Sequence, residues 1–237
     1  MEFSDLTPAF FVRKGNRFTA GVRLAKGGIS TAFIPTTGRL TGVLTPGCKV
    51  WLEKADNPDR KTPYTLVLGE LPGGGLCSTN AYLANILFGE AVEHGRLAAF
   101  TYPKVENEVP IGHSRLDFRL SNAEETCWVE VKSVTYVENQ VGMFPDAPTG
   151  RGRKHLGELE KLVESGDRAS AVFVAQRADA LTFAPYEAID PDFADALRHA
   201  VGNGVEVHAY RCAVSTEKIE IAEEITVFLD QIASNDS

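Results

Sequence analysis

The first eighty residues contain short runs of β-forming residues and no stretch with a good helical period. The breaks between these runs are Gly-Asn, Lys-Gly-Gly, Thr-Pro-Gly and Asp-Asn-Pro-Asp, which are typical turn sequences. Five short strands in about eighty residues suit a small closed barrel, either OB-like or SH3-like. The expected strands are FFVRK, RFTAGVRL, STAFIP, KVWLEK and YTLVLGEL.

After Leu-Pro-Gly-Gly-Gly the pattern changes to helices that alternate with strands. Ser78, Thr79 or Asn80 is expected to cap a helix that runs to about His94. This alternation predicts an α/β (α+β) domain in which helices cover a central mixed sheet. The later expected strands are SRLDFRL, CWVEVKSVTYV, ASAVFVAQ and VEVHAYRCAV, and the later helices are HLGELEKLVESG and PDFADALRHAVGNG. The expected domains are 1–80 and 81–237.

The composition narrows the class of protein. Hydrophobic residues make up 43% of the chain, which excludes extensive disorder. MEFSDLTPAF lacks the basic and apolar segments of a signal peptide, and no run reaches the roughly 18 apolar residues of a membrane helix. The cysteines form no C-x-x-C pair, which argues against a zinc site and for reduced thiols in a cytoplasmic protein. They are Cys48, Cys77, Cys127 and Cys212.

The net charge of −8 is distributed unevenly along the chain. Residues 1–88 hold ten Lys/Arg against six Asp/Glu, whereas residues 89–237 hold fourteen Lys/Arg against twenty-six Asp/Glu. A basic front half beside an acidic back half fits a binding module joined to a carboxylate-rich module. The acidic total by itself argues against strong binding to nucleic acid.

Two adjacent predicted strands carry charged residues at alternating positions. Side chains alternate faces along a strand, so Glu130 and Lys132 in CWVEVKS share one face, opposite Val129 and Val131. In SRLDFRL, Asp117 is expected opposite Leu116, Phe118 and Leu120. A hairpin between the strands would bring Asp117 beside Glu130 and Lys132. The pattern predicts two carboxylates and one ammonium at one edge of a sheet.

This cluster contains the groups that a metal-dependent phosphodiesterase needs. Hard cations such as Mg²⁺ or Mn²⁺ prefer carboxylate oxygens, and we expect Asp117 and Glu130 to hold one. Lys132 would then stabilise the charge that develops on a phosphate or orient a water. Glu90 lies on the expected apolar stripe of the first helix, either reaching water at its edge or pointing at the same cation. The structural alternative for the cluster is a surface ion pair.

Basic residues at two places are candidate DNA contacts. Four of them open the helix after PDAPTG, where positive charge opposes the helix dipole unless an anion binds there. Others dominate the barrel and are interleaved with Phe11, Phe18 and Tyr64, a mixture that can bind single strands, although Phe18 is more simply read as barrel core. The candidates for binding DNA are Arg13, Arg17, Arg39, Arg60, Lys61, Arg151, Lys154 and His155.

Several of these motifs resemble a known family. The order helix-Glu, strand-Asp, strand-E-x-K resembles the PD-(D/E)XK nucleases. More narrowly, NRFTAGV, IPTTGRLTG, RKTPYTL, SRLDF, VEVKSVT, FPDAPTGRG-KHL and GVEVHAY resemble the sugar fermentation stimulation protein (SfsA) family over nearly the whole chain. The resemblance implies an N-terminal OB-like domain, a C-terminal nuclease-like domain and DNA, single- or double-stranded, as the partner. It also implies a role in regulating sugar use.

Three sequence departures qualify the resemblance. Thr36 stands where the family usually has Asn, Gly150 where some members have Glu, and Leu116 where the nuclease pattern has Pro. The sequence thus favours a divalent-metal-dependent DNA nuclease with Asp117, Glu130 and Lys132 as its catalytic set. The alternative is a non-cleaving, DNA-binding transcriptional regulator of sugar (maltose) metabolism that keeps the nuclease fold. The oligomeric state stays open, with a homodimer as one option.

Overall fold

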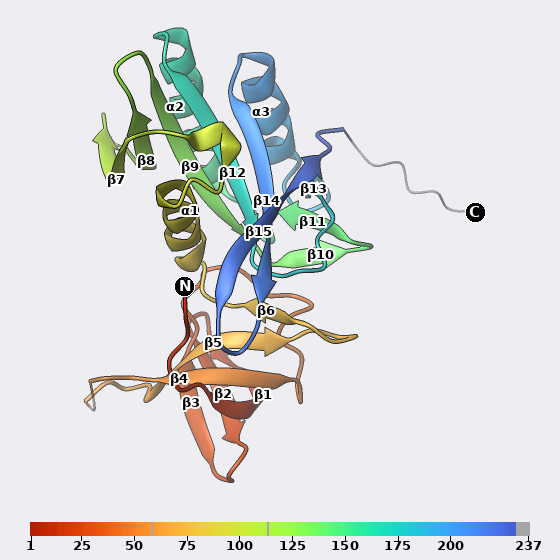
Figure 1. Cartoon of the computed structure of the whole chain (residues 1–237). Helices are drawn as coiled ribbons and strands as arrows, with labels where there is room; N and C mark the ends of the chain where they lie inside the picture. Colours follow the sequence, from red (N-terminus) through yellow and green to blue (C-terminus); the bar gives the residue numbers. More distant parts are fainter. Residues whose placement is uncertain (58, 113, 231–237) are drawn as a thin grey trace.

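The computed structural model describes residues 1–57, 59–112 and 114–230, and it consists of a β-barrel beside a larger α/β domain (Figure 1). In the barrel the strands run in the order β3-β2-β1-β4-β5-β6, and a parallel pairing of β3 with β5 closes it. A meander closed in this way is an OB-type barrel, so the OB-like alternative is confirmed over the SH3-like one. The strands are β1 (Thr7–Asn16), β2 (Thr19–Leu24), β3 (Ile29–Phe33), β4 (Lys49–Lys54), β5 (Tyr64–Glu70) and β6 (Leu76–Ser78).

The barrel core consists of small and branched side chains around Phe11, which is 4% exposed. Alternate residues of β2 point inward, and Ala20 and Val22 are fully buried. Phe18 does not belong to this core, because 42% of it is exposed. The expectation that Phe18 is a core residue was therefore wrong. Phe18 lies in the turn before β2, where its N–H donates to Asn16 Oδ1 at 2.8 Å, so the alternation of β2 does not extend to it.

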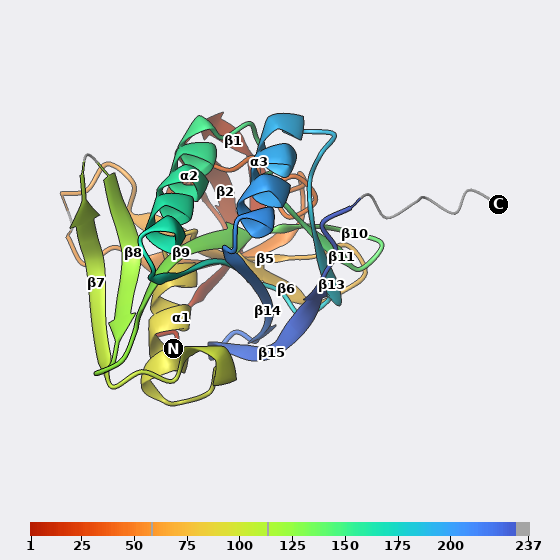
Figure 2. The same cartoon turned by 90° about the horizontal axis from the view of Figure 1, so that it is seen from above.

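The second domain is built on a nine-stranded mixed sheet in the order β10-β11-β13-β15-β14-β12-β9-β8-β7. Helix α1 covers one face, and α2 and α3 lie side by side on the other (Figure 2). The strands are β7 (Lys104–Ile111), β8 (Ser114–Ser121), β9 (Thr126–Val134), β10 (Tyr136–Glu138), β11 (Val141–Phe144), β12 (Arg168–Ala175), β13 (Thr182–Pro185), β14 (Glu206–Val214) and β15 (Ile219–Val227). The helices are α1 (Leu83–Glu93), the 3-10 helix η1 (Ala98–Phe100), α2 (Gly150–Glu164) and α3 (Pro191–Gly202).

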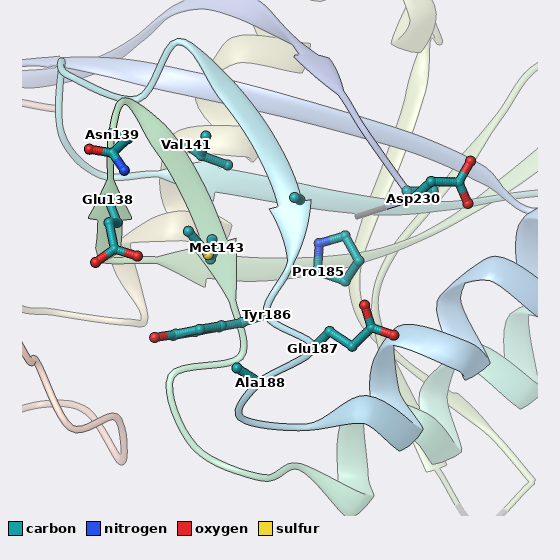
Figure 3. Close-up of a pocket in the computed structure, with 11 residues that line it drawn as sticks. Glu138, Asn139, Val141, Met143, Pro185, Tyr186, Glu187, Ala188 and Asp230 are labelled. Carbon is teal, nitrogen blue, oxygen red and sulfur yellow. The ribbon is translucent and has the colours of Figure 1, made fainter. Parts of the chain in front are cut away.

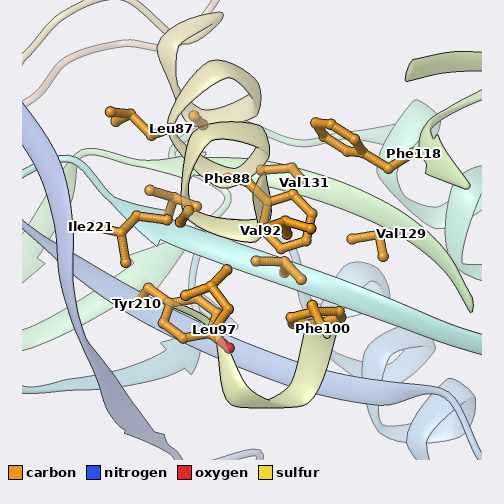
Figure 4. Packing of buried hydrophobic residues seen from close by; sticks show 14 of the residues in the cluster. Leu87, Phe88, Val92, Leu97, Phe100, Phe118, Val129, Val131, Tyr210 and Ile221 are labelled. Atoms are coloured by element: carbon orange, nitrogen blue, oxygen red, sulfur yellow. The ribbon is translucent and has the colours of Figure 1, made fainter. Parts of the chain in front are cut away.

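Each face of this sheet carries its own hydrophobic cluster. On the α1 face, the Phe88 ring packs edge-on against Phe100 and Phe118 at centroid distances of 5.1 and 5.0 Å (Figure 4). On the other face, α2 and α3 contribute Leu159 and Phe193, which are 0% and 1% exposed. Strand β9 lies between the two layers, because Val129 and Val131 belong to the cluster on the α1 face and Trp128 and Val134 belong to the cluster on the other face. Of the described helices, none is long and apolar enough to span a membrane.

The first helix begins later than the sequence predicted. It starts at Leu83 with Tyr82 as its N-cap, and no side chain caps it. The three expected caps make other contacts: Ser78 ends β6, Thr79 Oγ1 donates to a β5 carbonyl at 2.8 Å, and Asn80 Oδ1 accepts from Tyr82 N–H at 3.1 Å. The capping prediction was wrong because the Thr79 hydroxyl bonds to the barrel and the Asn80 side chain closes a local turn before the helix begins.

The domain junction places the barrel close to the N-terminus of α2. Ser78 N–H donates to Gln176 O at 3.0 Å, which connects β6 to the end of β12. Leu40 N–H donates to Asp146 Oδ2 at 3.2 Å, and Asp146 lies in the segment that leads from β11 into α2. The loop after β3, which carries Arg39, is therefore attached to the segment that precedes the basic N-terminus of α2.

Candidate functional site

Asp117 lies beside the E-x-K segment because two strands diverge at this point. Strand β8 pairs with β9 only as far as Phe118 and Val129. Beyond that pair, Val131 N–H donates to Asp117 Oδ2 at 2.8 Å in place of a strand partner. The alternation along β8 breaks at the same residue, since Leu116 packs on the α2 face and Phe118 on the α1 face. The expectation that Leu116 and Phe118 share a face was therefore wrong.

The carboxylate of Glu130 is the most buried charged group of the site. Its side chain is 5% exposed, and Oε1 accepts hydrogen bonds from Lys132 Nζ and from the His155 ring. Oε2 is buried and has no hydrogen-bond partner among the described residues. Burial acts to raise the pKa of Glu130, but the hydrogen bond from His155 and the positive charge of Lys132 outweigh it and hold the pKa below its ordinary value.

Asp117 has the opposite electrostatic balance. Burial, followed by the negative charge of Glu130, raises the pKa of Asp117 to about 6, although the Lys132 charge and the hydrogen bonds from Val131 and Asn85 act against the shift. The buried carboxylate of Glu130 and the half-buried carboxylate of Asp117 thus lie close to each other, and Asp117 holds its negative charge only at a cost. Such a pair would be stabilised by an additional positive charge.

Two residues of this network were not recognised in the sequence. Asn85 Nδ2 on α1 donates to Asp117 Oδ1 at 2.7 Å, and the ring Nδ1 of His155 on α2 contacts Glu130. His155 had been grouped with the DNA contacts, but it is buried at 4% exposure. The sequence held only a weak signal for Asn85, a polar residue near the start of an amphipathic helix. Both residues orient the carboxylates from opposite faces of the sheet.

Glu90 lies near Asp117 but makes a different contact. Both residues line a pocket of about 320 Å³ between α1 and the β7–β8 hairpin. The Glu90 carboxylate accepts a hydrogen bond from the Met1 ammonium at 2.8 Å. Within the described ranges, no group of three or more His, Cys, Asp or Glu side chains is placed to hold a metal ion. The structure thus brings Asp117 and Glu130 together and does not direct Glu90 at the same point.

The N-terminus of α2 presents exposed positive charge next to the buried network. Thr149 Oγ1 caps the helix by accepting from Gly152 N–H at 3.0 Å. Arg153 forms an ion pair with Asp190 at 3.0 Å, whereas Arg151 and Lys154 are exposed. A groove of about 580 Å³ at this end is lined by residues of the β7–β8 hairpin and of α2. Its lining residues are Glu108, Pro110, Gly112, Ser114, Arg115, Arg151, Lys154 and His155.

The predicted DNA contacts of the barrel are spread over its surface. Arg13, Arg17 and Lys61 are exposed, and Arg60 is half-buried with a hydrogen bond of 3.0 Å to Thr65 Oγ1. These residues lie on the barrel and not in the groove beside α2.

Arg39 lies in the barrel loop that contacts the segment leading into α2. Lys14 Nζ donates to Arg39 O at 2.6 Å, and the next residue, Leu40, is bonded to Asp146. The Arg39 side chain is exposed at this junction.

A further pocket contains none of the predicted site residues. It has a volume of about 350 Å³ and lies at the β10–β11 and β13 edge of the sheet (Figure 3). Tyr186 is in its wall and stacks on Tyr136 with ring centroids 4.9 Å apart. Asp117, Glu130 and the basic residues at the start of α2 therefore lie outside this pocket.

The raised pKa of Asp117 makes a testable prediction about stability. The folded state binds the Asp117 proton more tightly than the unfolded state, whose value is near 3.8, so stability is lost as pH rises from there to about 6. Asp117→Asn removes the loss of stability that ionisation of Asp117 causes, and it also removes one hydrogen-bond acceptor, which offsets part of the gain. We expect the metal-free variant to be more stable than the wild type by roughly 2 kcal/mol at pH 7.5, with the difference vanishing near pH 4.

Urea unfolding at several pH values in the presence of a chelator measures this difference. The control is Asp5→Asn, an exposed aspartate outside the site, which should change the unfolding free energy by less than about 0.5 kcal/mol. A pH-independent effect of Asp117→Asn would contradict the assigned electrostatic cost.

Comparison with known proteins places the chain in a family. The profile of the sugar fermentation stimulation protein RE domain matches residues 82–218, and the profile of the SfsA N-terminal OB domain matches residues 12–78. A sugar fermentation stimulation protein homolog of Geobacter metallireducens is 44% identical, over 95% of this chain and 98% of that protein. A homolog of Shewanella baltica is 40% identical, over 96% of this chain and 99% of that protein.

A solved structure extends the match to three dimensions. Pyrococcus furiosus SfsA in complex with Ca²⁺ superposes with a TM-score of 0.88 at 33% identity and covers 96% of this chain and 98% of that one. The match to that structure and the match to the homologous sequences both extend over nearly the full length of this chain. The chain belongs to the sugar fermentation stimulation protein (SfsA) family.

Proposed function

We propose that the protein is a divalent-metal-dependent nuclease that acts on DNA, with Asp117 and Glu130 as metal ligands. The observation that carries the proposal is Glu130 Oε2, a buried carboxylate oxygen without a hydrogen-bond partner in the described part of the chain. A buried charged oxygen without a partner is costly. Asp117 adds a second carboxylate whose charged form is disfavoured by burial. A cation between these oxygens would relieve both costs.

The chemistry of the donors fits Mg²⁺ or Mn²⁺. Carboxylate oxygens are preferred ligands of hard cations, and Mg²⁺ is commonly held by one or two of them with water and substrate phosphate completing the shell. When bound, such a cation supplies Lewis-acid polarisation of a phosphoryl oxygen and lowers the pKa of a water. The Pyrococcus furiosus relative was solved with Ca²⁺, another hard divalent cation, which supports the same kind of ligand here.

The protein side chains supply orientation and charge. Val131 N–H and Asn85 fix both oxygens of Asp117, and His155 fixes the Glu130 carboxylate through Oε1. The Lys132 ammonium, 17% exposed, lies where it can stabilise negative charge on a phosphate that enters from the surface. Because the site already contains its orienting hydrogen bonds, little reorganisation is needed when a substrate binds.

The exposed cations beside the site support DNA as the substrate. Arg115, Arg151 and Lys154 line the groove at the N-terminus of α2. No described carboxylate forms an ion pair with Arg151 or Lys154. Free cations can neutralise backbone phosphates and release counterions. The four free cysteines fit a reducing compartment, so we propose the cytoplasm as the place of action.

Titration calorimetry tests the metal site. The wild type should bind one Mg²⁺, Mn²⁺ or Ca²⁺ per chain, and Asp117→Asn and Glu130→Gln should weaken binding. The loss should be no smaller than the roughly 10–100-fold that follows removal of an outer-shell partner. The matched control is Glu124→Gln, an exposed carboxylate in the β8–β9 turn. Equal affinity in the wild type and Asp117→Asn would place the metal elsewhere or remove it from the proposal.

A second candidate is a DNA-binding regulator that keeps the fold without cleaving. The observation that favours it concerns Glu90, the third predicted metal ligand. Its carboxylate accepts a hydrogen bond from the Met1 ammonium, and in the described residues it does not join Asp117 and Glu130 in a group that could hold a metal ion. Incubation of plasmid and single-stranded DNA with Mg²⁺ or Mn²⁺ separates the two. Cleavage that depends on Lys132 supports the nuclease, whereas DNA binding without any cleavage supports the regulator.

A further inference from the structure

Two phenylalanines and two arginines form a continuous stack on the outside of the barrel. The Phe18 and Phe33 rings stack with centroids 6.5 Å apart and an interplanar angle of 29°. The Arg17 guanidinium lies over Phe18 at 5.5 Å from the ring centroid, and the Arg60 guanidinium lies over Phe33 at 5.1 Å. We call these four residues the stacking platform. Its order is Arg17, Phe18, Phe33, Arg60.

The platform is accessible and keeps its positive charge. Phe18 is 42% exposed, although it is an aromatic residue that could have been buried. In the described residues, neither Arg17 nor Arg60 forms an ion pair with a carboxylate. Arg60 is held instead by a neutral hydrogen bond to Thr65 Oγ1. A ligand with both π-faces and negative charge would therefore complement this surface on both counts.

The position of the platform agrees with the general binding mode of OB folds. Phe18 lies in the β1–β2 turn, Phe33 ends β3, and Arg60 lies in the loop between β4 and β5. OB folds bind oligonucleotides on the face of their second and third strands and with the loops that join strands 1–2 and 4–5. All three parts of that surface contribute to the stack. The barrel core does not depend on this stack for its packing, because the core cluster contains neither Phe18 nor Phe33.

The platform also lies within reach of the second domain. Arg39 is six positions after Phe33 along the chain, a span of at most roughly 22 Å. The residue after Arg39 is bonded to Asp146, in the segment that enters α2. A nucleic-acid strand could thus extend from the platform past Arg39 to the groove that contains Arg151.

We propose that the stacking platform binds unpaired bases of a single-stranded nucleic acid, with Phe18 as the ring on which a base stacks. The proposal rests on the proposed function and defines its substrate as a strand with an unpaired segment. Aromatic side chains hold single strands because every base has a π-face, while cations follow the backbone. In an intact duplex the base faces are already stacked on each other, so the platform selects single strands over duplexes.

Fluorescence anisotropy tests the platform with a labelled thymidine oligonucleotide and a duplex of the same length. The experiment uses the full chain with Lys132→Ala and a chelator, so that cleavage does not interfere. Phe18→Ala should weaken single-strand binding by roughly 5- to 100-fold, as expected for loss of one stacked base, and should leave duplex binding unchanged. Phe18→Trp should retain single-strand binding. Ile29→Ala, which removes another exposed apolar side chain of the same barrel at 73% exposure, is the matched control and should have no effect.

The salt dependence distinguishes stacking from charge. Arg17→Ala should lower the slope of log affinity against log salt by about 0.7, whereas Phe18→Ala should leave the slope unchanged. Circular dichroism and a melting curve check that each variant is folded. The proposal is overturned if Phe18→Ala binds the single strand as tightly as Ile29→Ala does, or loses single strand and duplex equally. If the protein binds single strands through Phe18 but never cleaves them, the platform stands and the nuclease proposal is disproved. Failure of the platform and failure of the proposed function therefore give different results.

Discussion

Lys132→Ala should lower the rate of Mg²⁺-dependent DNA cleavage by on the order of 10²–10³-fold, the usual cost of losing one electrostatic stabiliser. The physical reason is the position of its ammonium, which contacts Glu130 Oε1 and is 17% exposed toward the surface. Metal affinity should be unchanged or higher, because the substitution frees a carboxylate oxygen and removes a positive charge that repels the cation. Loss of activity and retention of metal together distinguish this lysine from a ligand.

The measurement is single-turnover cleavage of a labelled oligonucleotide alongside calorimetric metal titration. Lys161→Ala, an exposed lysine near the other end of α2, is the control and should cleave at the wild-type rate. Normal cleavage by Lys132→Ala would remove the catalytic role of Lys132 without affecting the fold. If Glu130 and Lys132 were only a structural ion pair, Lys132→Ala would change stability and leave cleavage intact.

Lys132→Ala combined with His155→Ala should destabilise the metal-free protein by about 3–5 kcal/mol at pH 7.5. Both donors to Glu130 Oε1 are then gone, and Oε2 has no described partner, so a buried carboxylate remains without compensation. Glu130→Gln in the same background should recover much of the loss, because a neutral amide costs less to bury. Mg²⁺ should also recover part of it by replacing the lost positive charge.

The pH dependence of that destabilisation has a defined sign. The pKa of Glu130 is depressed in the folded wild type, so its ion-paired contribution is present above the unfolded value near 4.5 and is lost as pH falls through the folded value. In the double variant both groups that lower the pKa of Glu130 are gone, so burial raises it. The difference in unfolding free energy between the two proteins should therefore shrink as pH falls toward 4.5. A destabilisation of the same size at every pH would indicate lost packing and not an uncompensated charge.

The sequence alone determined the features that depend on local periodicity. Alternation along CWVEVKS placed Glu130 and Lys132 on one side of β9 and Val129 and Val131 on the other, as observed. Turn sequences between short β-forming runs determined that a barrel comes first and an α/β domain follows. These predictions succeeded because the direction of a side chain along a strand is set by the backbone of that strand.

Several short or half-exposed strands could not be predicted from the local sequence pattern. Strands β6, β7, β11, β13 and β15 were not predicted, and β10 was predicted as the end of the strand that forms β9. These strands are brief or half-exposed and gain their order by pairing with other strands. For example, β11 pairs in parallel with β13, about forty residues later in the chain. Such pairing is decided by how the whole sheet assembles and leaves little trace in the local pattern.

Only the tertiary structure decided which groups surround the two carboxylates. Asn85 and His155 lie on helices on opposite faces of the sheet, 32 and 25 residues from the carboxylates that they contact. The divergence of β8 from β9, which gives Asp117 the N–H of Val131, and the position of Phe18 outside the barrel core were equally unpredictable. Each depends on where separate elements pack against one another, and local sequence fixes the direction of a side chain but not the element that it will meet.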